Sequence, residues 1–339
     1  MHILVTGAAG FIGHHLSVRF CRDGHSVVGL DNLNAYYSPE LKQSRLARMA
    51  SFPAFRFERM DICDGDDIEG LFAREHFTHV AHMAAQAGVR YSLENPLAYA
   101  RSNLYGFSVI LEACRSHAVE HLLFASSSSV YGRSAVKPFS ASAQGGADHP
   151  VSLYAATKRS NELCAHSYSS VYGLPATGLR FFTVYGPWGR PDMALFIFTR
   201  AILEGRDVPV FNMGRQCRDF TYIDDVVEAV ATLLPHRPAP VPDGITPDPS
   251  CSAAPFRIYN VGAEHPTPLP DFITVLEDCL GRRARLELLP PRPGDVDETC
   301  ADIEPLHRAT GFSPRISLRQ GISAFVAWYR DYYGHSDEG

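Results

Sequence analysis

The chain has 339 residues, of which 45% are hydrophobic, and it carries a formal net charge of −6. This length suits one large domain with an added lobe, or two domains. The acidic balance, without any strongly basic stretch, argues against nucleic acid or an anionic membrane as the main partner.

Seven apolar runs with the length and β-branched content of strands alternate with helical patterns. They cover residues 2–6, 26–30, 55–60, 78–84, 121–126, 176–182 and 257–261. Strands that are apolar on both faces and alternate with helices are typical of a parallel sheet covered by helices. We therefore expect an α/β fold with a doubly wound, Rossmann-type sheet of about seven strands.

A glycine-rich turn joins the first predicted strand to the first predicted helix in HILVTGAAGFIGHHL. Gly7, Gly10 and Gly13 have the spacing G-x-x-G-x-x-G. Glycines at such a junction let the backbone approach a pyrophosphate, whose charge then faces unpaired N–H groups at the start of the helix. The position of the motif predicts a dinucleotide site.

Acidic residues end the next two predicted strands. Asp31 ends the run VVGLDN, and Asp61 follows the third strand in RMDICD. A carboxylate at the end of the second strand accepts hydrogen bonds from an adenosine ribose diol and repels a 2′-phosphate, which favours NAD over NADP. Asp61 would meet the adenine edge. The alternative is that both carboxylates only cap the ends of their strands.

Four serines follow the apolar run HLLFA, where a buried strand ends. Ligands of open parallel sheets bind beyond the carboxyl ends of the strands, so these hydroxyls are expected to belong to a site. Tyr154 and Lys158, spaced i, i+4 in YAATK, share one face of a predicted helix. The ammonium group would bring the pKa of the tyrosine towards the working range. We predict that Ser127, Tyr154 and Lys158 are the catalytic residues.

The alternation of strands and helices weakens from about residue 184. We expect an NAD-binding domain made of residues 1–183 and about 216–262. A smaller C-terminal substrate-binding lobe would combine about 184–215 with 263–339. The segment 235–255, rich in proline and aspartate, is expected to be a surface loop before the last strand.

Neither metal ligands nor targeting segments are visible in the sequence. The eight cysteines include no C-x-x-C pair, so we expect reduced thiols and no zinc site. The histidines show no metal-ligand spacing either. Because a predicted strand begins at residue 2 and no long apolar segment is present, we expect a cytoplasmic protein.

Long motifs extend over nearly the whole chain, from Ile3 to about Tyr333: DNLNAYYSPELKQSRL, AAQAGVRYSLENP, ASSSSVYG, HPVSLYAATKRSNEL, LRFFTVYGPWGRPDMALFIFTRAILEG, RDFTYIDD and RPGDVDETCAD. In these motifs the chain resembles the extended short-chain dehydrogenases/reductases that act on nucleotide sugars, and most of all the UDP-glucuronate 4-epimerases. The resemblance implies a tightly bound NAD that is regenerated in each turnover. It also implies further cofactor contacts beside the glycines, the two acids, Tyr154 and Lys158, namely Phe11, Ile12, Asn32, Ile62, Ala84, Ala85 and Asn103.

For the substrate, the resemblance implies a UDP-sugar held by residues from several segments. Arg218 and Arg292 would clamp the diphosphate, which suits the guanidinium fork, and Phe211 would lie against the uracil. Arg190 would pair with the C6 carboxylate of glucuronate, the alternative being a surface ion pair with Asp192. Thr183 stands where many related epimerases have asparagine. The remaining expected contacts are Arg90, Ser128, Ser129, Thr183, Ala194 and Asp295.

The reaction implied by the resemblance interconverts UDP-glucuronate and UDP-galacturonate. Tyr154 would take the proton from the sugar O4 while C4 gives a hydride to NAD, the 4-keto sugar would turn over, and the hydride would return to its opposite face. Related decarboxylases carry glutamate at the position of Ser129, and related dehydratases carry an Asp–Glu pair at Ser128 and Ser129. A UDP-glucuronate decarboxylase and a UDP-glucose/UDP-galactose 4-epimerase are the alternatives, and a neutral hexose would not need Arg190.

The helices predicted near 97–117 and 154–172 carry apolar and aromatic residues on more than one face. The resembled family pairs these helices in a dimeric four-helix bundle, so we expect a homodimer. The alternative is that all these residues pack on their own sheet. The residues concerned are Leu104, Phe107, Ile110, Leu111, Leu163, Tyr168 and Tyr172.

Overall fold

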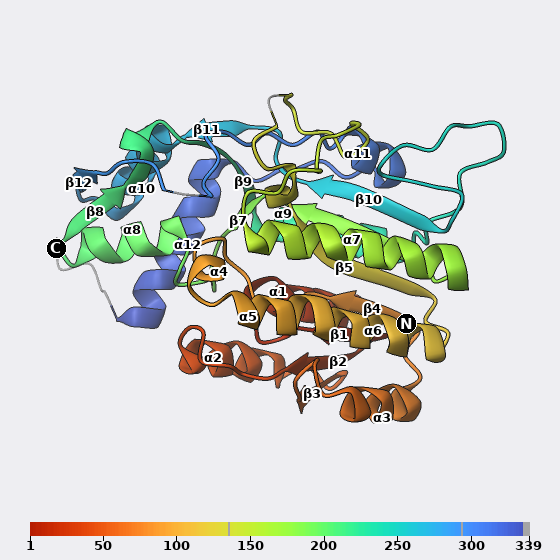
Figure 1. The fold of residues 1–339 in the computed structure, drawn as a ribbon. Helices are drawn as coiled ribbons and strands as arrows, with labels where there is room; N and C mark the ends of the chain where they lie inside the picture. The colour runs from red at the N-terminus through yellow and green to blue at the C-terminus, as the bar shows by residue number, and fades with distance from the viewer. Residues whose placement is uncertain (135, 293, 335–339) are drawn as a thin grey trace.

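The computed structural model describes residues 1–134, 136–292 and 294–334. Within these ranges a seven-stranded sheet forms the centre of the fold, in the order β3-β2-β1-β4-β5-β6-β10, with every neighbouring pair parallel (Figure 1). The prediction of a doubly wound α/β sheet is confirmed, since each predicted run overlaps one strand. The strands are β1 (His2–Thr6), β2 (Ser26–Asp31), β3 (Phe55–Arg59), β4 (His79–His82), β5 (His121–Ser127), β6 (Ala176–Phe181) and β10 (Phe256–Val261).

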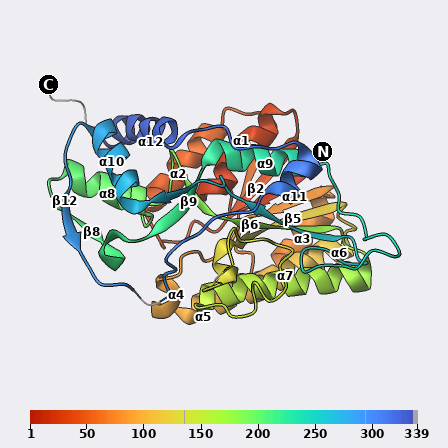
Figure 2. The same ribbon diagram turned by 90° about the horizontal axis from the view of Figure 1, so that it is seen from above.

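Helices cover both faces of this sheet. α1 and α9 lie on one face, and α3, α6 and α7 lie on the other (Figure 2). Because side chains of a strand alternate between its faces, Ile3 and Val5 of β1 enter the core under α1 and α9, while Leu4 enters the core under α3 and α6. The bounds are α1 (Phe11–Arg22), α9 (Ile223–Leu233), α3 (Gly65–Glu75), α6 (Gly106–Ser116) and α7 (Leu153–Tyr172).

Shorter elements connect these layers near the carboxyl edge of the sheet. α2 (Pro39–Met49) begins after the loop that follows β2, and its N-cap Ser38 accepts a hydrogen bond from the Leu41 N–H. α4 (Tyr91–Glu94), α5 (Pro96–Tyr99) and a π-helical turn (Ala100–Tyr105) lead from β4 into α6. The serine run ends β5 and continues as a 3₁₀ turn over Ser128–Tyr131. The polar residues after β2, β4 and β5 are thereby placed beside one another.

A smaller group of elements packs at the carboxyl side of the sheet. Its largest helices are α8 (Ala194–Leu203), α10 (Leu269–Leu280), α11 (Glu304–Thr310) and α12 (Leu318–Tyr333). β8 (Asp207–Val210) pairs with β12 (Arg285–Leu288), and β9 (Cys217–Tyr222) pairs with β7 (Thr183–Tyr185) and β11 (Pro266–Pro268). β9 belongs to the predicted NAD-binding domain, so a shared small sheet crosses the predicted boundary. The two-domain division stays a prediction, and residues 335–339 of the predicted lobe lie outside the described residues.

The segment 235–255 has neither helix nor strand of its own and projects beyond β10 (Figure 1). It is tied back by an isolated bridge between Cys251 and Arg257 and by a hydrogen bond from the Val241 N–H to the Ser252 carbonyl, 2.9 Å long. Among the described helices, none combines the length and apolar character that crossing a membrane requires.

Candidate active site

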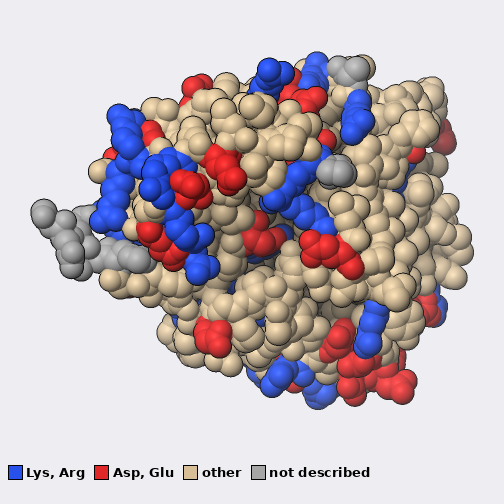
Figure 3. Space-filling view, turned by 60° about the vertical axis from the view of Figure 1, so that its left-hand side comes forward, with Lys and Arg blue, Asp and Glu red and all other residues tan. Residues whose placement is uncertain are grey.

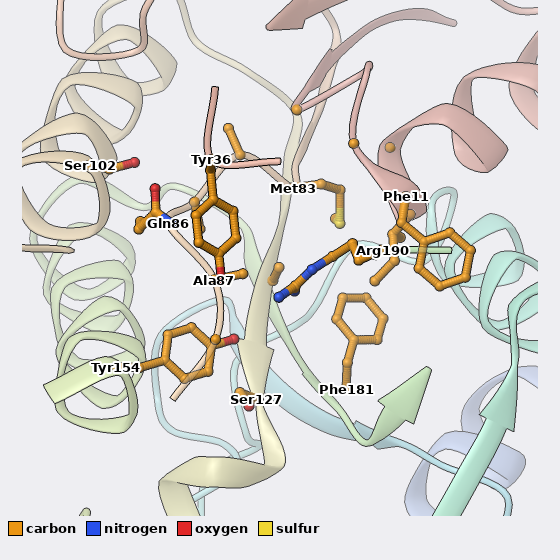
Figure 4. Close-up of a pocket in the computed structure, with 18 of the residues that line it drawn as sticks. Phe11, Tyr36, Met83, Gln86, Ala87, Ser102, Ser127, Tyr154, Phe181 and Arg190 are labelled. Carbon is orange, nitrogen blue, oxygen red and sulfur yellow. The ribbon is translucent and has the colours of Figure 1, made fainter. Parts of the chain in front are cut away.

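A cavity of about 370 Å³ opens at the carboxyl edge of the sheet, where the strand order reverses between β1 and β4. Figure 4 shows its walls, with Tyr154 and Ser127 on one side and Phe11 on the other. Most of the predicted site residues line it. They are Gly7, Gly10, Phe11, Ile12, Gly13, Asp31, Asn32, Asp61, Ile62, Ala84, Ala85, Ser127, Ser128, Ser129, Tyr154, Lys158, Thr183 and Arg190.

The glycine turn is tightly folded against the start of α1. Gly7 has a φ of 69°, and a Cβ added to Gly13 would lie 2.1 Å from the Gly7 carbonyl oxygen, which no side chain could occupy. Gly10 is the N-cap of α1, and no side chain of the described residues caps that helix. The first N–H groups of α1 therefore face the cavity wall without side-chain acceptors, as a pyrophosphate site requires.

The two strand-end acids line the cavity and also hold their own loops. Asp31 Oδ1 accepts a hydrogen bond of 2.8 Å from the Leu33 N–H, and it lies 3.9 Å from Lys42 Nζ. Asp61 accepts hydrogen bonds from the Cys63 N–H and from Asn32 Nδ2, at 2.9 and 3.1 Å. Burial alone would raise the pKa of Asp61, but these hydrogen bonds lower it. Asp31 and Asp61 therefore cap the ends of their strands and also line the cavity.

Lys158 and Tyr154 line the same cavity, and the place of the Lys158 ammonium group beside the phenol stays a prediction. Lys158 Nζ donates to the Ala125 carbonyl oxygen at 2.8 Å, at the end of β5. Burial raises the pKa of Tyr154, whereas the Ser127 hydroxyl and the charge of Arg190 lower it. Burial also lowers the pKa of Lys158 to about 8, although Glu162 acts in the opposite direction. The ammonium is drawn to the strand-end carbonyl because that oxygen needs a donor in a buried position.

A buried ion cluster lies behind this pair, one helical turn beyond Lys158. The Glu162 carboxylate accepts hydrogen bonds of 2.8 Å from both Nε and Nη2 of Arg180. It also accepts bonds from Ser126 Oγ at 2.6 Å and from Arg159 Nη1 at 2.9 Å. Sequence reasoning missed this cluster, because its members come from β5, β6 and α7. It fixes the turn of α7 that carries Lys158 against the strand that carries the serines.

Arg190 enters the cavity from the loop between β7 and α8 (Figure 4). Its Nε donates to Asp192 Oδ1 at 3.0 Å and its Nη2 to Asp192 Oδ2 at 2.5 Å. Burial opposes the charge on Arg190, but the Asp192 carboxylate outweighs it and raises the pKa of the guanidinium. The ion pair with Asp192, which was the predicted alternative, is present. It uses only two of the five N–H groups of Arg190, so the others can donate to a ligand.

The other predicted substrate residues gather beside the cavity. Arg292 lies over the Phe211 ring, with 3.3 Å between its guanidinium carbon and the ring centroid, and Arg90 lies over the same ring at 5.4 Å. Burial and the neighbouring Arg90 charge lower the pKa of Arg292. Arg218 donates to the Cys217 and Asp297 carbonyl oxygens, both at 3.0 Å. On this side of the molecule, basic and acidic side chains together border a hollow (Figure 3).

Asp295 completes this group of charges. Its Oδ2 lies 4.0 Å from Arg90 Nη2 and accepts a hydrogen bond from Gln216 Nε2 at 3.3 Å. Val89, which lines the cavity, would be 3.1 Å from a Cβ on Gly294, next to these residues. The cluster around Phe211 is therefore adjacent to the cavity without being part of its wall.

Besides the cluster around Phe211, two more predicted contacts do not line the main cavity. Asn103 is buried behind it, where its side chain amide bonds the main-chain N–H and C=O of Gln86 and the hydroxyl of Thr157. Asn103 therefore positions the loop after β4. Ala194 begins α8 and borders a small apolar recess beside Arg190 and Met193.

Sequence reasoning also missed residues that do line the cavity. Gln86 has a buried Nε2 that finds no acceptor within the part of the chain that the structure describes, so it is suited to donate to a ligand. Tyr36 and Lys42 come from the loop after β2 and from α2, and both line the cavity. The signal for all three lay in the motifs DNLNAYYSPELKQSRL and AAQAGVRYSLENP, which follow β2 and β4.

The glycine turn and the Tyr154–Lys158 pair open into one cavity, and an acid ends the second strand beside it. Among doubly wound folds, this combination is that of the short-chain dehydrogenases/reductases. Residues 3–262 match the model of the NAD dependent epimerase/dehydratase family, and the chain belongs to that family. The cradle at Gly7–Gly13 and the acid at Asp31 fit the NAD that the family uses.

Known proteins resemble the chain over nearly its whole length. A 37.6 kDa protein from the cld 5′ region of Escherichia coli O111:H- is 54% identical over 338 residues, covering 98% of this chain and 99% of that protein. UDP-glucuronate 4-epimerase 3 of Arabidopsis thaliana is 46% identical over 336 residues, covering 98% and 77%. UDP-glucuronic acid 4-epimerase of Bacillus cereus, solved with UDP-glucuronic acid and NAD, is 32% identical with a TM-score of 0.87, covering 98% and 100%.

Proposed function

We propose that this protein is a UDP-glucuronate 4-epimerase, which interconverts UDP-glucuronate and UDP-galacturonate with NAD as a resident cofactor. The observation that carries the proposal is Arg190, whose guanidinium enters the same cavity as Tyr154 and Ser127. A fixed positive charge there suits a sugar that bears a carboxylate, and a neutral hexose would not need it. The Arabidopsis and Bacillus cereus relatives, named for activity on UDP-glucuronate, support the same substrate.

The polar residues at the end of β5 and on α7 would handle the proton of the sugar O4. Tyr154 accepts this proton. Burial raises the pKa of Tyr154, and the Ser127 hydroxyl and the positive charge of Arg190 act against that rise. Lys158, anchored on the Ala125 carbonyl, keeps a second positive charge beside the same wall of the cavity. Bound NAD would supply the hydride acceptor and donor for C4. Gly7, Gly10 and Gly13 would hold its pyrophosphate, and Asp31 its adenosine ribose.

Arg190 would have a second task once C4 is oxidised. A 4-keto-uronic acid is a β-keto acid, which loses CO2 most easily when the carboxylate bond lies perpendicular to the carbonyl plane. Asp192 occupies the Nε side of the Arg190 guanidinium, and the remaining N–H groups can hold the sugar carboxylate away from that alignment. Ser128 and Ser129 supply no acid to assist loss of carbon or water.

The cluster around Phe211 would receive the UDP part of the substrate. Arg292 and Arg90 lie over one aromatic ring, although their like charges repel each other. A diphosphate between these groups would neutralise that repulsion, and Arg218 would add a third guanidinium. The Phe211 ring offers a face on which a uracil can stack.

The direct test is to incubate the purified protein with UDP-glucuronate and separate the products by chromatography with mass detection. We expect UDP-galacturonate, with no net consumption of added NAD. A UDP-pentose together with CO2 would identify a decarboxylase instead. Activity with UDP-glucose but none with UDP-glucuronate would identify the neutral-hexose epimerase.

Replacing Arg190 by alanine should lower kcat/KM for UDP-glucuronate by about a hundredfold, because a charge-assisted pair to the carboxylate contributes roughly 1.5–3 kcal/mol. The same substitution should change kcat/KM for UDP-glucose by less than about threefold. Steady-state kinetics with both sugars measure the two effects. An equal loss for both sugars would show that Arg190 does not recognise the carboxylate.

The exposed apolar side chains of α7 favour a homodimer. Leu163 and Val171 are 57% and 67% exposed and lie on one face of the helix, whereas Phe107 and Ile110 of α6 are buried in their own core. Leu163→Glu is therefore expected to convert a dimer into a monomer, as measured by light scattering after gel filtration. Leu286→Glu, at an exposed leucine of β12, is the matched control and should leave the mass unchanged. A monomeric native protein would refute this assembly.

A further inference from the structure

A fully buried arginine lies between the dinucleotide turn and the loop that carries Arg190. Arg45 belongs to α2, in the middle of a motif whose role the proposed reaction leaves unexplained, and its side chain is 0% exposed. No carboxylate among the described residues forms an ion pair with it. A buried guanidinium without an acidic partner is unfavourable unless its N–H groups are bonded in some other way.

Main-chain oxygens take nearly all of the hydrogen bonds that this guanidinium can donate. Nε and Nη2 both donate to the Trp188 carbonyl, at 3.1 and 2.6 Å, and Nη2 also donates to the Gly189 carbonyl at 3.1 Å. Nη1 donates to the Ala9 carbonyl at 2.8 Å and to the Tyr37 hydroxyl at 2.6 Å. These five bonds use all five N–H groups of the side chain. Arg45 thus ties three separate segments to one rigid, planar group.

The segment that Arg45 holds is one that would not keep its shape alone. Trp188 has a φ of 62°, in the left-handed region that a residue with a Cβ rarely adopts. Its ring is anchored separately, between Trp328 at 5.2 Å and Arg48 at 4.8 Å. The carbonyls of Trp188 and Gly189 immediately precede Arg190, so the bonds from Arg45 fix the point from which the Arg190 side chain starts.

A second contact from the same part of the chain reaches the other side of Arg190. The Tyr36 hydroxyl donates to Asp192 Oδ2 at 3.1 Å, and Asp192 in turn binds Arg190. In Figure 4 the Tyr36 ring and the Arg190 guanidinium lie close to each other, and both bind the same oxygen of Asp192. Residues 36–45 therefore hold the Arg190 loop by its main chain and by its acidic partner, while Arg45 also contacts the glycine turn at Ala9.

We propose that Arg45 is a positioning residue for Arg190. Through its bonds to the Trp188, Gly189 and Ala9 carbonyls, it holds the Arg190 loop at a fixed position relative to the dinucleotide turn. The inference rests on the proposed function, since it assumes that Arg190 reads the sugar carboxylate. Arg45 is not among the described residues that line the cavity. Its effect is expected to pass through Arg190, so it should disappear when Arg190 is absent.

A double-mutant cycle with Arg45→Lys and Arg190→Ala tests this dependence. Lysine keeps the positive charge but has one compact ammonium group, which cannot span the Ala9, Trp188 and Gly189 carbonyls. With NAD added in excess, Arg45→Lys alone is expected to lower kcat/KM for UDP-glucuronate by about tenfold. In the Arg190→Ala background, the same change should have an effect of less than about twofold. If the loss of kcat/KM in the double variant equals the product of the two single losses, the proposal is wrong.

The ratio of two dissociation constants supplies a second test. A purely structural role of Arg45 would leave this ratio unchanged. Titration calorimetry gives the ratio of the UDP-glucuronate and UDP-glucose dissociation constants for each of the four proteins. Arg45→Lys should reduce the preference for the uronate about tenfold when Arg190 is present, and leave it unchanged when Arg190 is absent. A selectivity ratio that Arg45→Lys leaves untouched contradicts the positioning role.

Two further variants keep the test decisive. Arg48→Lys lies one turn away on α2 and retains its cation over the Trp188 ring, so kcat/KM should stay within about twofold. If Arg45→Lys does not fold, Tyr37→Phe removes one acceptor from Arg45, and a smaller loss is expected, again only when Arg190 is present. A native protein without epimerase activity on UDP-glucuronate would defeat the proposed function. An active native protein with multiplying losses would defeat only the role of Arg45.

Discussion

Tyr154→Phe is expected to lower kcat for UDP-glucuronate by a factor of about 10²–10⁴, the usual contribution of a positioned general base. The substitution removes only the hydroxyl that accepts the O4 proton, while the ring keeps its packing against Tyr99 at 6.1 Å. The dissociation constant of UDP-glucuronate should therefore change little, and the loss should appear in kcat. Steady-state kinetics together with calorimetric binding separate the two quantities.

Tyr172→Phe is the matched control for this prediction. Tyr172 ends the same helix, its side chain is 56% exposed, and the same atom is removed. Its kcat should remain within about twofold of the native value. If Tyr154→Phe keeps more than about a tenth of the native kcat, the O4 proton must be taken by another group, and the assignment of Tyr154 as the base is wrong.

Glu162→Gln is expected to lower the free energy of unfolding by about 3–5 kcal/mol, because it leaves the buried Arg180 without its carboxylate. The side chains of Glu162 and Arg180 are 1% and 2% exposed, so water cannot replace the lost partner. Gln retains the shape of the residue, which excludes a cavity as the cause. Urea unfolding of the native and substituted proteins at neutral pH measures the difference.

The effect of Glu162→Gln should depend on pH in a defined direction. Burial alone would raise the pKa of Glu162, but Arg180 and Ser126 lower it below the ordinary value of 4.5. The stability that this carboxylate adds is therefore fully present above that value and is lost as the pH falls through the lowered pKa. The difference between the two proteins should shrink in acid.

Glu304→Gln provides the comparison for a surface pair. Glu304 and Arg308 form an i, i+4 ion pair on α11 with both side chains mostly exposed. Water solvates both groups there, so the substitution should leave the unfolding transition unchanged within error. If Glu162→Gln behaves in the same way as Glu304→Gln, the buried cluster does not stabilise the fold as the geometry indicates.

The parts of the protein that the sequence alone determined are those encoded by local patterns. Apolar runs of strand length predicted every strand of the central sheet, because strands buried on both faces need such runs. The short strands β8, β11 and β12 lacked this pattern, since three or four residues at an edge are held by pairing rather than by their own composition. The spacing of Tyr154 and Lys158 placed both on one face of α7 for the same local reason.

Only the tertiary structure decided the polar partners of the site. Lys158 binds the Ala125 carbonyl, 33 residues away, and Glu162 binds Arg180 of another element. Arg45 joins Ala9, 36 residues before it, to Trp188, 143 residues after it. A buried donor must find an acceptor wherever packing brings one within reach, and no spacing along the sequence encodes that choice. Local periodicity therefore fixed the scaffold and the residue types of the site, and long-range packing fixed which groups meet.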